Sequence, residues 1–148
     1  MSTSTFEDTR MSVRFKISAL WIAMLFLFAY GDIFGFFRRG VIEDVLAGEI
    51  SGVEINQLFL FAVSAYIAIA GVMVYLTLVL KPKVSRVTNI VLPVLYIISI
   101  VASAIGEGWA YYIFLSVGEC VLLLLVVWHA WTWPREPSAT SASSATGA

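Results

Sequence analysis

The feature that most constrains this chain is an apolar run at residues 109–133 with one carboxylate, Glu119, near its middle. The run exceeds the roughly 20 residues that a helix needs to cross a bilayer. It begins and ends in aromatic residues, which are common at membrane interfaces. Because an ionised side chain in hydrocarbon is costly, Glu119 must face protein or water. The other helices must therefore be arranged to shelter it.

Three further apolar runs predict additional membrane spans. Hydrophobic residues make up 60% of the 148 residues and charged residues only 13%, against roughly a quarter charged in an average soluble domain. A soluble protein of this length could not hide so much apolar surface. We therefore predict an all-α polytopic membrane protein, a four-transmembrane-helix antiparallel bundle in one domain. The domain covers residues 16–133, with spans at about 17–37, 55–80, 87–106 and 109–133.

The segments outside the spans are short or polar. Residues 1–15 and the Ser-, Thr- and Ala-rich residues 134–148 are predicted to be flexible or disordered tails. The sequence VIEDVLAG, residues 41–48, indicates a short helix on the membrane surface. Residues 81–86 are predicted to form a basic turn, because Pro82 cannot continue a helix interior.

Lysine and arginine predict the orientation in the membrane. Seven of them lie in the two tails and the turn between the second and third spans, whereas two lie in the first loop. By the positive-inside rule we expect a multi-pass protein of the inner (plasma) membrane with cytoplasmic N- and C-termini. Asp32, Gln57 and Glu107 then belong to the outer half of the membrane.

Glu119 is the strongest candidate for a functional residue. On a helix it shares one face with Tyr112 and Ser116. Burial favours the neutral form of a carboxyl group, so Glu119 is either a neutral hydrogen-bond donor or an ionised group beside a bound cation. The alternative is an acid that hydrogen-bonds across helices for packing alone. The complete set of ligand- or ion-binding candidates is Glu119, Asp32, Gln57, Glu107, Tyr112 and Ser116.

The remaining candidates have plausible structural alternatives. Asp32 could instead form an ion pair with Arg39, seven positions later. Glu107 could be a solvated acid in the turn between the third and fourth spans. Gln57 begins a face of small and polar residues that is predicted to pack against neighbouring helices. That face continues through Ser64, Ala68, Gly71 and Tyr75.

Several kinds of chemistry are not indicated. The single cysteine, Cys120, excludes an intramolecular disulfide. The single histidine, His129, excludes two-histidine haem ligation within the chain and argues against a His-rich metal site. No phosphate-binding loop or nucleophile–base set is present. We predict no catalytic residue, no metal and no cofactor, and we favour a non-enzymatic role over a membrane enzyme of quinone or lipid chemistry.

Three segments carry a resemblance to a known family. They are KISALWIAMLFLFAYGDIFGFF, which contains Asp32, the turn KPKVSRVTNI, and YYIFLSVGECVLLLLVVWHAWTW, which contains Glu119. They resemble a family of small bacterial four-helix integral membrane proteins of unknown function, over most of residues 16–133. The resemblance implies four helices and no particular activity. A more distant likeness, in shape alone, is to four-helix DoxX-type proteins.

Two functions follow from these observations. The first is a polar pocket in the outer half of the bundle that binds or conducts a proton, a cation or a small amphipathic ligand. If it conducts, a homo-oligomer is expected, because one copy encloses little space. The alternative is a non-catalytic structural or accessory subunit of a larger membrane complex. The expected partners are the lipid bilayer and either further copies or a larger membrane protein, and the net charge of −1 does not indicate nucleic acid.

Overall fold

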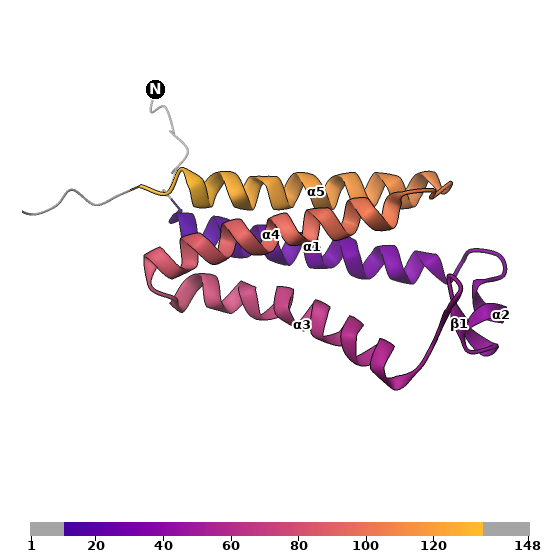
Figure 1. The fold of residues 1–148 in the computed structure, drawn as a ribbon. Coiled ribbons are helices and arrows are strands. Elements are labelled where there is room, and N and C mark those ends of the chain that lie inside the picture. The colour runs from indigo at the N-terminus through magenta and orange to yellow at the C-terminus, as the bar shows by residue number, and fades with distance from the viewer. Residues whose placement is uncertain (1–10, 135–148) are drawn as a thin grey trace, which may run out of the picture.

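The computed structural model describes residues 11–134, which form a bundle of four long helices (Figure 1). These helices are α1 (Val13–Gly35), α3 (Gln57–Val79), α4 (Pro82–Ala104) and α5 (Ala110–Trp131). All four are long and apolar enough to cross a membrane. The prediction of an all-α multi-pass membrane protein is therefore confirmed. Most of the two predicted flexible tails lies outside the described residues.

Two predicted boundaries are wrong. The first helix begins at Val13, inside the segment predicted to be a tail. The third long helix, α4, begins at Pro82, so the basic segment at 82–86 is helical rather than a turn. Proline is well tolerated in the first turn of a helix, because the N–H group that it lacks would have no helical partner there. Pro82 therefore starts α4, and the connection from α3 is only Leu80–Lys81.

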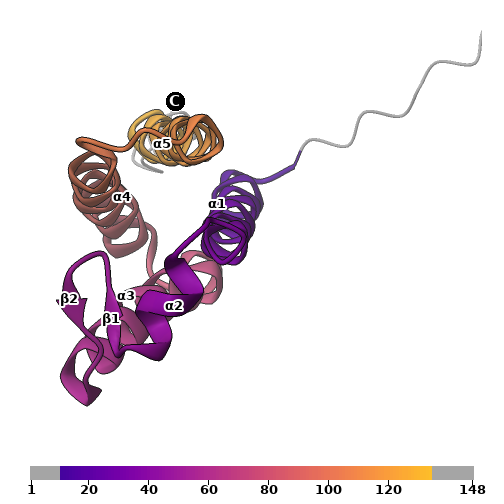
Figure 2. The same ribbon diagram turned by 90° about the vertical axis from the view of Figure 1, so that its right-hand side faces the viewer.

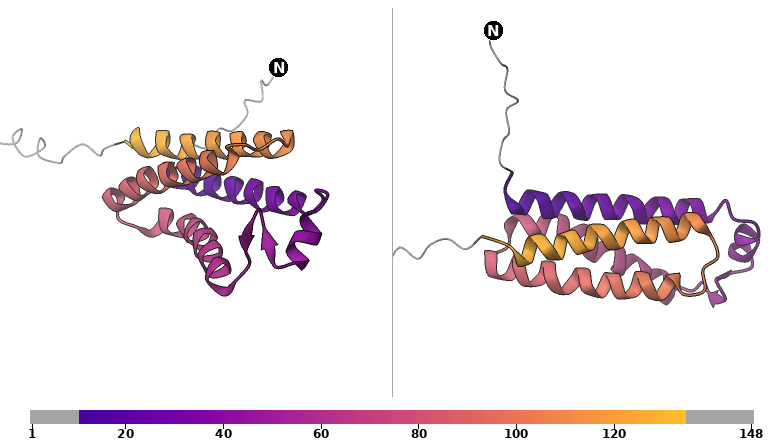
Figure 3. Two further views of the ribbon diagram at one scale, coloured as in Figure 1. Left: turned by 45° about the vertical axis from the view of Figure 1, so that its right-hand side comes forward. Right: turned by 90° about the horizontal axis from the view of Figure 1, so that it is seen from above.

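The four helices form an incomplete square in cross-section. Helix α5 packs between α1 and α4, while α3 packs mainly on α1 (Figure 2). The predicted antiparallel pairing of α4 and α5 is confirmed. Helices α3 and α4 are close at their connecting turn and separate towards the other end (Figures 1 and 3). We call the end with the α3–α4 turn the terminal end, and the opposite end the hairpin end.

A small folded loop connects α1 to α3 at the hairpin end (Figure 1). It contains α2 (Val41–Leu46), as predicted, followed by the two short strands β1 (Glu49–Ile50) and β2 (Val53–Glu54). The strands pair antiparallel. The two residues that connect them, Ser51 and Gly52, have φ angles of 52° and 77°. Two positive φ values are typical of the tight turn whose twist matches a β-hairpin.

The best-packed part of the protein lies in the terminal half of the bundle. Here α1 and α5 contribute large side chains that are almost completely buried, among them Ile17, Trp21, Met24, Leu123 and Val126. Because lipid is as apolar as these side chains, close packing rather than water exclusion stabilises this contact. The centre of this half of the bundle is therefore densely packed.

A hydrogen-bonded network lies inside this core. Trp21 Nε1 donates to Asn89 Oδ1 at 2.8 Å, which requires the amide oxygen to face Trp21, because an indole N–H can only donate. Asn89 Nδ2 donates to Thr77 Oγ1 at 3.1 Å and to the Ser85 carbonyl oxygen at 2.8 Å. Thr77, Ser85 and Asn89 are each 0% exposed. We call these four residues the Asn89 network; it joins α1, α3 and α4, and no sequence pattern assigned it a role.

Candidate functional site

A cavity of about 220 Å³ lies in the hairpin half of the bundle. All four long helices contribute to its wall. Its polar lining consists of Asp32 from α1, Tyr66 from α3, Ser99 and Ser103 from α4, and Tyr112, Ser116 and Glu119 from α5. Four of the six predicted candidates therefore line one cavity. We call it the Glu119 cavity.

Glu119 lies at the bottom of this set and is 5% exposed. Its side chain lines the cavity from the same face of α5 as Tyr112 and Ser116, as the helical spacing predicts. One residue earlier, a Cβ atom at Gly118 would lie only 3.0 Å from Leu27 Cδ1, so α1 and α5 approach closely there. Within residues 11–134, no protein group hydrogen-bonds to the Glu119 carboxyl group and no basic side chain pairs with it. The carboxyl group thus faces the cavity without a protein partner.

Most of the tyrosine and serine hydroxyls in the wall already donate hydrogen bonds to other protein groups. Tyr66 Oη and Ser99 Oγ are 2.6 Å apart, and Ser99 donates to the Tyr96 carbonyl oxygen. Because that bond uses the hydrogen of Ser99, Tyr66 is the donor to Ser99. Tyr112 likewise donates to Ser103 Oγ at 3.0 Å, and Ser103 donates to a backbone carbonyl oxygen of its own helix. These four hydroxyls therefore offer mainly acceptor lone pairs to a ligand.

Asp32 lies at the exposed side of the same cavity. The alternative prediction, an ion pair between Asp32 and Arg39, is not found among the described residues. Asp32 is therefore a second carboxylate of the cavity. A Cβ atom built on Gly31, the residue before Asp32, would lie 3.6 Å from Leu115 Cδ1. Helices α1 and α5 are therefore in ordinary van der Waals contact at this level.

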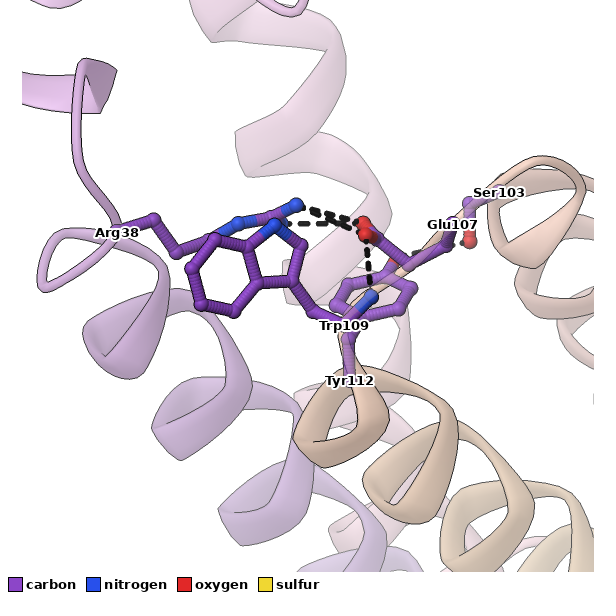
Figure 4. Close-up of polar contacts among 5 residues, drawn as sticks. All are labelled: Arg38, Ser103, Glu107, Trp109 and Tyr112. Atoms are coloured by element: carbon purple, nitrogen blue, oxygen red, sulfur yellow. Dashed lines mark hydrogen bonds and ion pairs between the residues drawn. The ribbon is translucent and has the colours of Figure 1, made fainter.

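Glu107 does not line the cavity, which corrects its assignment as a pocket residue. It accepts three hydrogen bonds from the Arg38 guanidinium, at 2.8, 3.1 and 3.1 Å (Figure 4). It also accepts one from the Trp109 backbone N–H at 3.0 Å, and the Arg38 guanidinium lies 5.0 Å from the Trp109 ring centre. We call these three residues the Arg38 clasp. The alternative of a solvated acid is also wrong, because Glu107 ties the end of α1 to the α4–α5 turn.

The clasp shifts the protonation of Glu107. Loss of hydration raises the pKa of this carboxyl group, but the hydrogen bonds from Arg38 and the Trp109 backbone outweigh that effect. The net result is a pKa below the ordinary value for glutamate. Glu107 is consequently an ionised structural residue at neutral pH.

Gln57 is the second candidate that lies elsewhere. It is exposed at the start of α3, where that helix has separated from α4. The remaining residues of its predicted packing face are also exposed: Ser64, Ala68, Gly71 and Tyr75. The face is predicted to pack against neighbouring helices, but no helix within residues 11–134 covers it, because the opposite side of α3 packs on α1 through residues such as Ala70 and Met73.

The cavity includes polar residues that were not predicted as site residues. Ser99 and Ser103 could have been found, since their four-residue spacing puts them on one face of the third span. Tyr66 had no such signal, because only the packing of α3 against α1 directs it inwards. Among the described residues, no group of three or more His, Cys, Asp or Glu side chains could hold a metal ion.

These observations define a class: a multi-pass helical membrane protein with four helices long and apolar enough to cross a bilayer. The chain belongs to the family described as "Family of unknown function (DUF6326)", whose model it matches over residues 4–140. This confirms the resemblance to a membrane family of unknown function. The bacterial origin stays an expectation, and the likeness to DoxX-type proteins is not confirmed. No curated protein and no solved structure matches the chain significantly.

Proposed function

We propose that the Glu119 cavity binds a small organic cation, such as a protonated amine, that donates hydrogen bonds. The observation that carries this proposal is Glu119, a residue only 5% exposed whose carboxyl group reaches the cavity without a donor from the described protein. A buried carboxyl group is costly unless something pairs with it. The partner must therefore come from the contents of the cavity.

The chemistry of the wall supports a donor-rich ligand. Asp32 and Glu119 supply two carboxyl groups, and the four committed hydroxyls supply acceptor lone pairs. Among the hydroxyl groups of the cavity wall, only that of Ser116 has no acceptor within the described residues. A cavity of about 220 Å³ is below the usual 300–1,000 Å³ of drug-sized pockets. It suits a ligand of a few heavy atoms, with or without water.

Binding is better supported than conduction through one copy. Below the cavity, the terminal half of the bundle is filled by Trp21, Leu123 and Val126, all fully buried. The Asn89 network in the same layer has its hydrogen-bonding groups paired within the protein. A hydrated path would have to break this layer. We further propose that the cavity lies in the outer half of the inner membrane, with both termini in the cytoplasm.

The test is ligand-dependent thermal stability of the full-length protein in detergent. We expect a panel of small amines to raise Tm by roughly 5 °C at about 100 times Kd. Glu119→Gln should abolish this rise without unfolding the protein. Glu43→Gln, which removes an exposed carboxylate on α2, is the matched control and should keep it. If amines stabilise the wild type and Glu119→Gln equally, the proposal is wrong.

The alternative, a structural or accessory subunit, is favoured by one observation. The outward face of α3, from Gln57 to Tyr75, carries small and polar residues that no helix within residues 11–134 covers. Such faces let transmembrane helices approach one another closely. Purification from native membranes in a mild detergent tests this alternative. A stoichiometric larger partner, lost when Gly71→Leu is introduced, would support it over ligand binding.

A further inference from the structure

The terminal end of the bundle differs in charge from the hairpin end. All its charged side chains within residues 11–134 are basic: Arg14, Lys16, Lys81, Lys83 and Arg86. The described acidic residues lie in the hairpin half, at the cavity, or in the loop around α2. The terminal end is therefore a cationic rim next to apolar helix surfaces.

A cleft of about 840 Å³ lies in this rim, between the start of α4 and the segment that follows α5. Its lining includes Lys83, Arg86, Val87 and Ile90 from α4, together with Trp133. The α4 residues recur every three or four positions and so share one face of the helix. Ile90 lies roughly 10 Å further into the bundle than Lys83, at 1.5 Å of rise per residue. The cleft thus changes from cationic to apolar with depth.

The two basic side chains can receive an anion. Arg86 donates one bond, at 3.2 Å, to the Trp131 carbonyl oxygen and lies 5.9 Å from the Trp131 ring centre. This contact orients the guanidinium, which has five N–H donors in all. Lys83 is exposed and has no ion-pair partner among residues 11–134. In addition, no side chain caps the start of α4, so the first-turn N–H groups add positive potential.

We propose that this cleft binds an anionic phospholipid. Its phosphate lies against Lys83 and Arg86, Trp133 lies at headgroup level, and an acyl chain follows Val87 and Ile90. Along the cleft, basic side chains come first and apolar side chains follow. A phospholipid has the same order, with its phosphate before its hydrocarbon chains. A free phosphate ion would not use the apolar part of the cleft. Basic sites beside transmembrane helices and interfacial tryptophans are both suited to lipid headgroups.

The experiment compares lipids on the full-length protein by native mass spectrometry from a mild detergent. We expect phosphatidylglycerol to be retained and phosphatidylcholine with the same acyl chains to be lost. Lys83→Gln should weaken phosphatidylglycerol binding about fivefold, and Arg86→Gln at least as much. Lys16→Gln removes a charge at the same end but outside the cleft, and it should leave binding unchanged. Glycerol 3-phosphate at equal concentration should not displace the lipid.

Three outcomes would overturn the proposal. Equal retention of phosphatidylcholine would show that the headgroup charge is not recognised. An equal loss in Lys16→Gln and Lys83→Gln would indicate diffuse attraction to the whole basic rim. Displacement by glycerol 3-phosphate would indicate a site for a free phosphate compound. Far-ultraviolet circular dichroism of each variant separates these outcomes from unfolding.

Discussion

The Asn89 network and the Glu119 cavity are two polar regions in opposite halves of one bundle, and they are built differently. In the Asn89 network, the amide, indole and hydroxyl groups bond to one another and are fully buried. In the Glu119 cavity, hydroxyls bond to the wall while the carboxyl group of Glu119 bonds to nothing in the described protein.

The difference shows how burial separates a structural polar group from a functional one. A satisfied buried network makes one helix arrangement more stable than others, because each partner would be costly to expose or leave unpaired. A buried carboxyl group without a partner lowers the stability of the fold unless a ligand or water pairs with it or a proton neutralises it. Proteins retain such groups mainly where they serve a function.

The largest effect is expected from Asn89→Leu, which tests the structural half of the comparison. It leaves the Trp21 indole N–H without a partner inside the packed core, while the Thr77 hydroxyl keeps only its bond to the Met73 carbonyl oxygen. We expect a loss of about 3 kcal/mol in the free energy of unfolding, measured by denaturation with SDS in mixed micelles. The matched control is Asn56→Ala, which removes the exposed cap of α3 and should cost about 1 kcal/mol. Equal losses in the two variants would contradict the assignment.

The next effect is expected at the Arg38 clasp. Arg38→Gln and Glu107→Gln should each destabilise the protein, and a double-mutant cycle should give a coupling energy of about 1 kcal/mol. The side chains are only 23% and 15% exposed and meet in a forked geometry, so solvent screens them incompletely. An additive double variant would mean that the clasp does not hold α1 to the α4–α5 turn.

The clasp also predicts a pH dependence. Because the folded protein lowers the pKa of Glu107, its contribution is fully present above the ordinary glutamate pKa of about 4.3. The contribution is lost as pH falls through the lower folded value. We therefore expect a steeper loss of stability below pH 4 in the wild type than in Glu107→Gln, measured by thermal melts. Parallel curves would refute this.

A smaller effect of opposite sign is expected from Glu119→Leu. It replaces an unpartnered buried acid by an apolar side chain, so stability should be unchanged or should rise by up to about 1 kcal/mol. Amine binding should disappear in the same variant. The same SDS titration measures the first quantity and thermal shift measures the second. A loss as large as that of Asn89→Leu would make Glu119 a packing residue and remove the contrast between the two halves.

The smallest effect is expected from Tyr112→Phe. It removes the bond to Ser103 Oγ, while Ser103 keeps its bond to the backbone of α4. We expect a loss below about 1 kcal/mol in stability. Amine affinity should change more than stability does, because the altered group faces the cavity. Isothermal titration of amines, with Tyr75→Phe on the exposed face of α3 as control, checks this.

Much of the fold could be predicted from local information. The apolar runs are longer than a bilayer requires, so four spans followed from length and composition. The short connection around Gly106 made α4 and α5 neighbours. The error at Pro82 arose because a proline can either stop a helix or begin one, and sequence alone does not distinguish the two positions.

Which polar residues meet was less predictable. Helical spacing grouped Tyr112 and Ser116 with Glu119 correctly, because all three belong to one helix. Glu107 and Gln57 were assigned to the same pocket from membrane depth alone, and depth does not specify direction around a helix axis. The Asn89 network was missed for the same reason, since its members come from three helices.

The amino-acid sequence by itself determined that the chain is a four-span membrane protein with a sheltered acid in its last helix. The length and hydrophobicity of each span depend only on its own residues, so they can be determined from the sequence without knowledge of contacts between helices. Tertiary structure alone decided that α3 turns its small-residue face outwards, that Glu107 pairs with Arg38, and that Glu119 faces a cavity. These outcomes depend on how each helix is rotated about its axis, which is set by side-chain packing between helices distant in sequence.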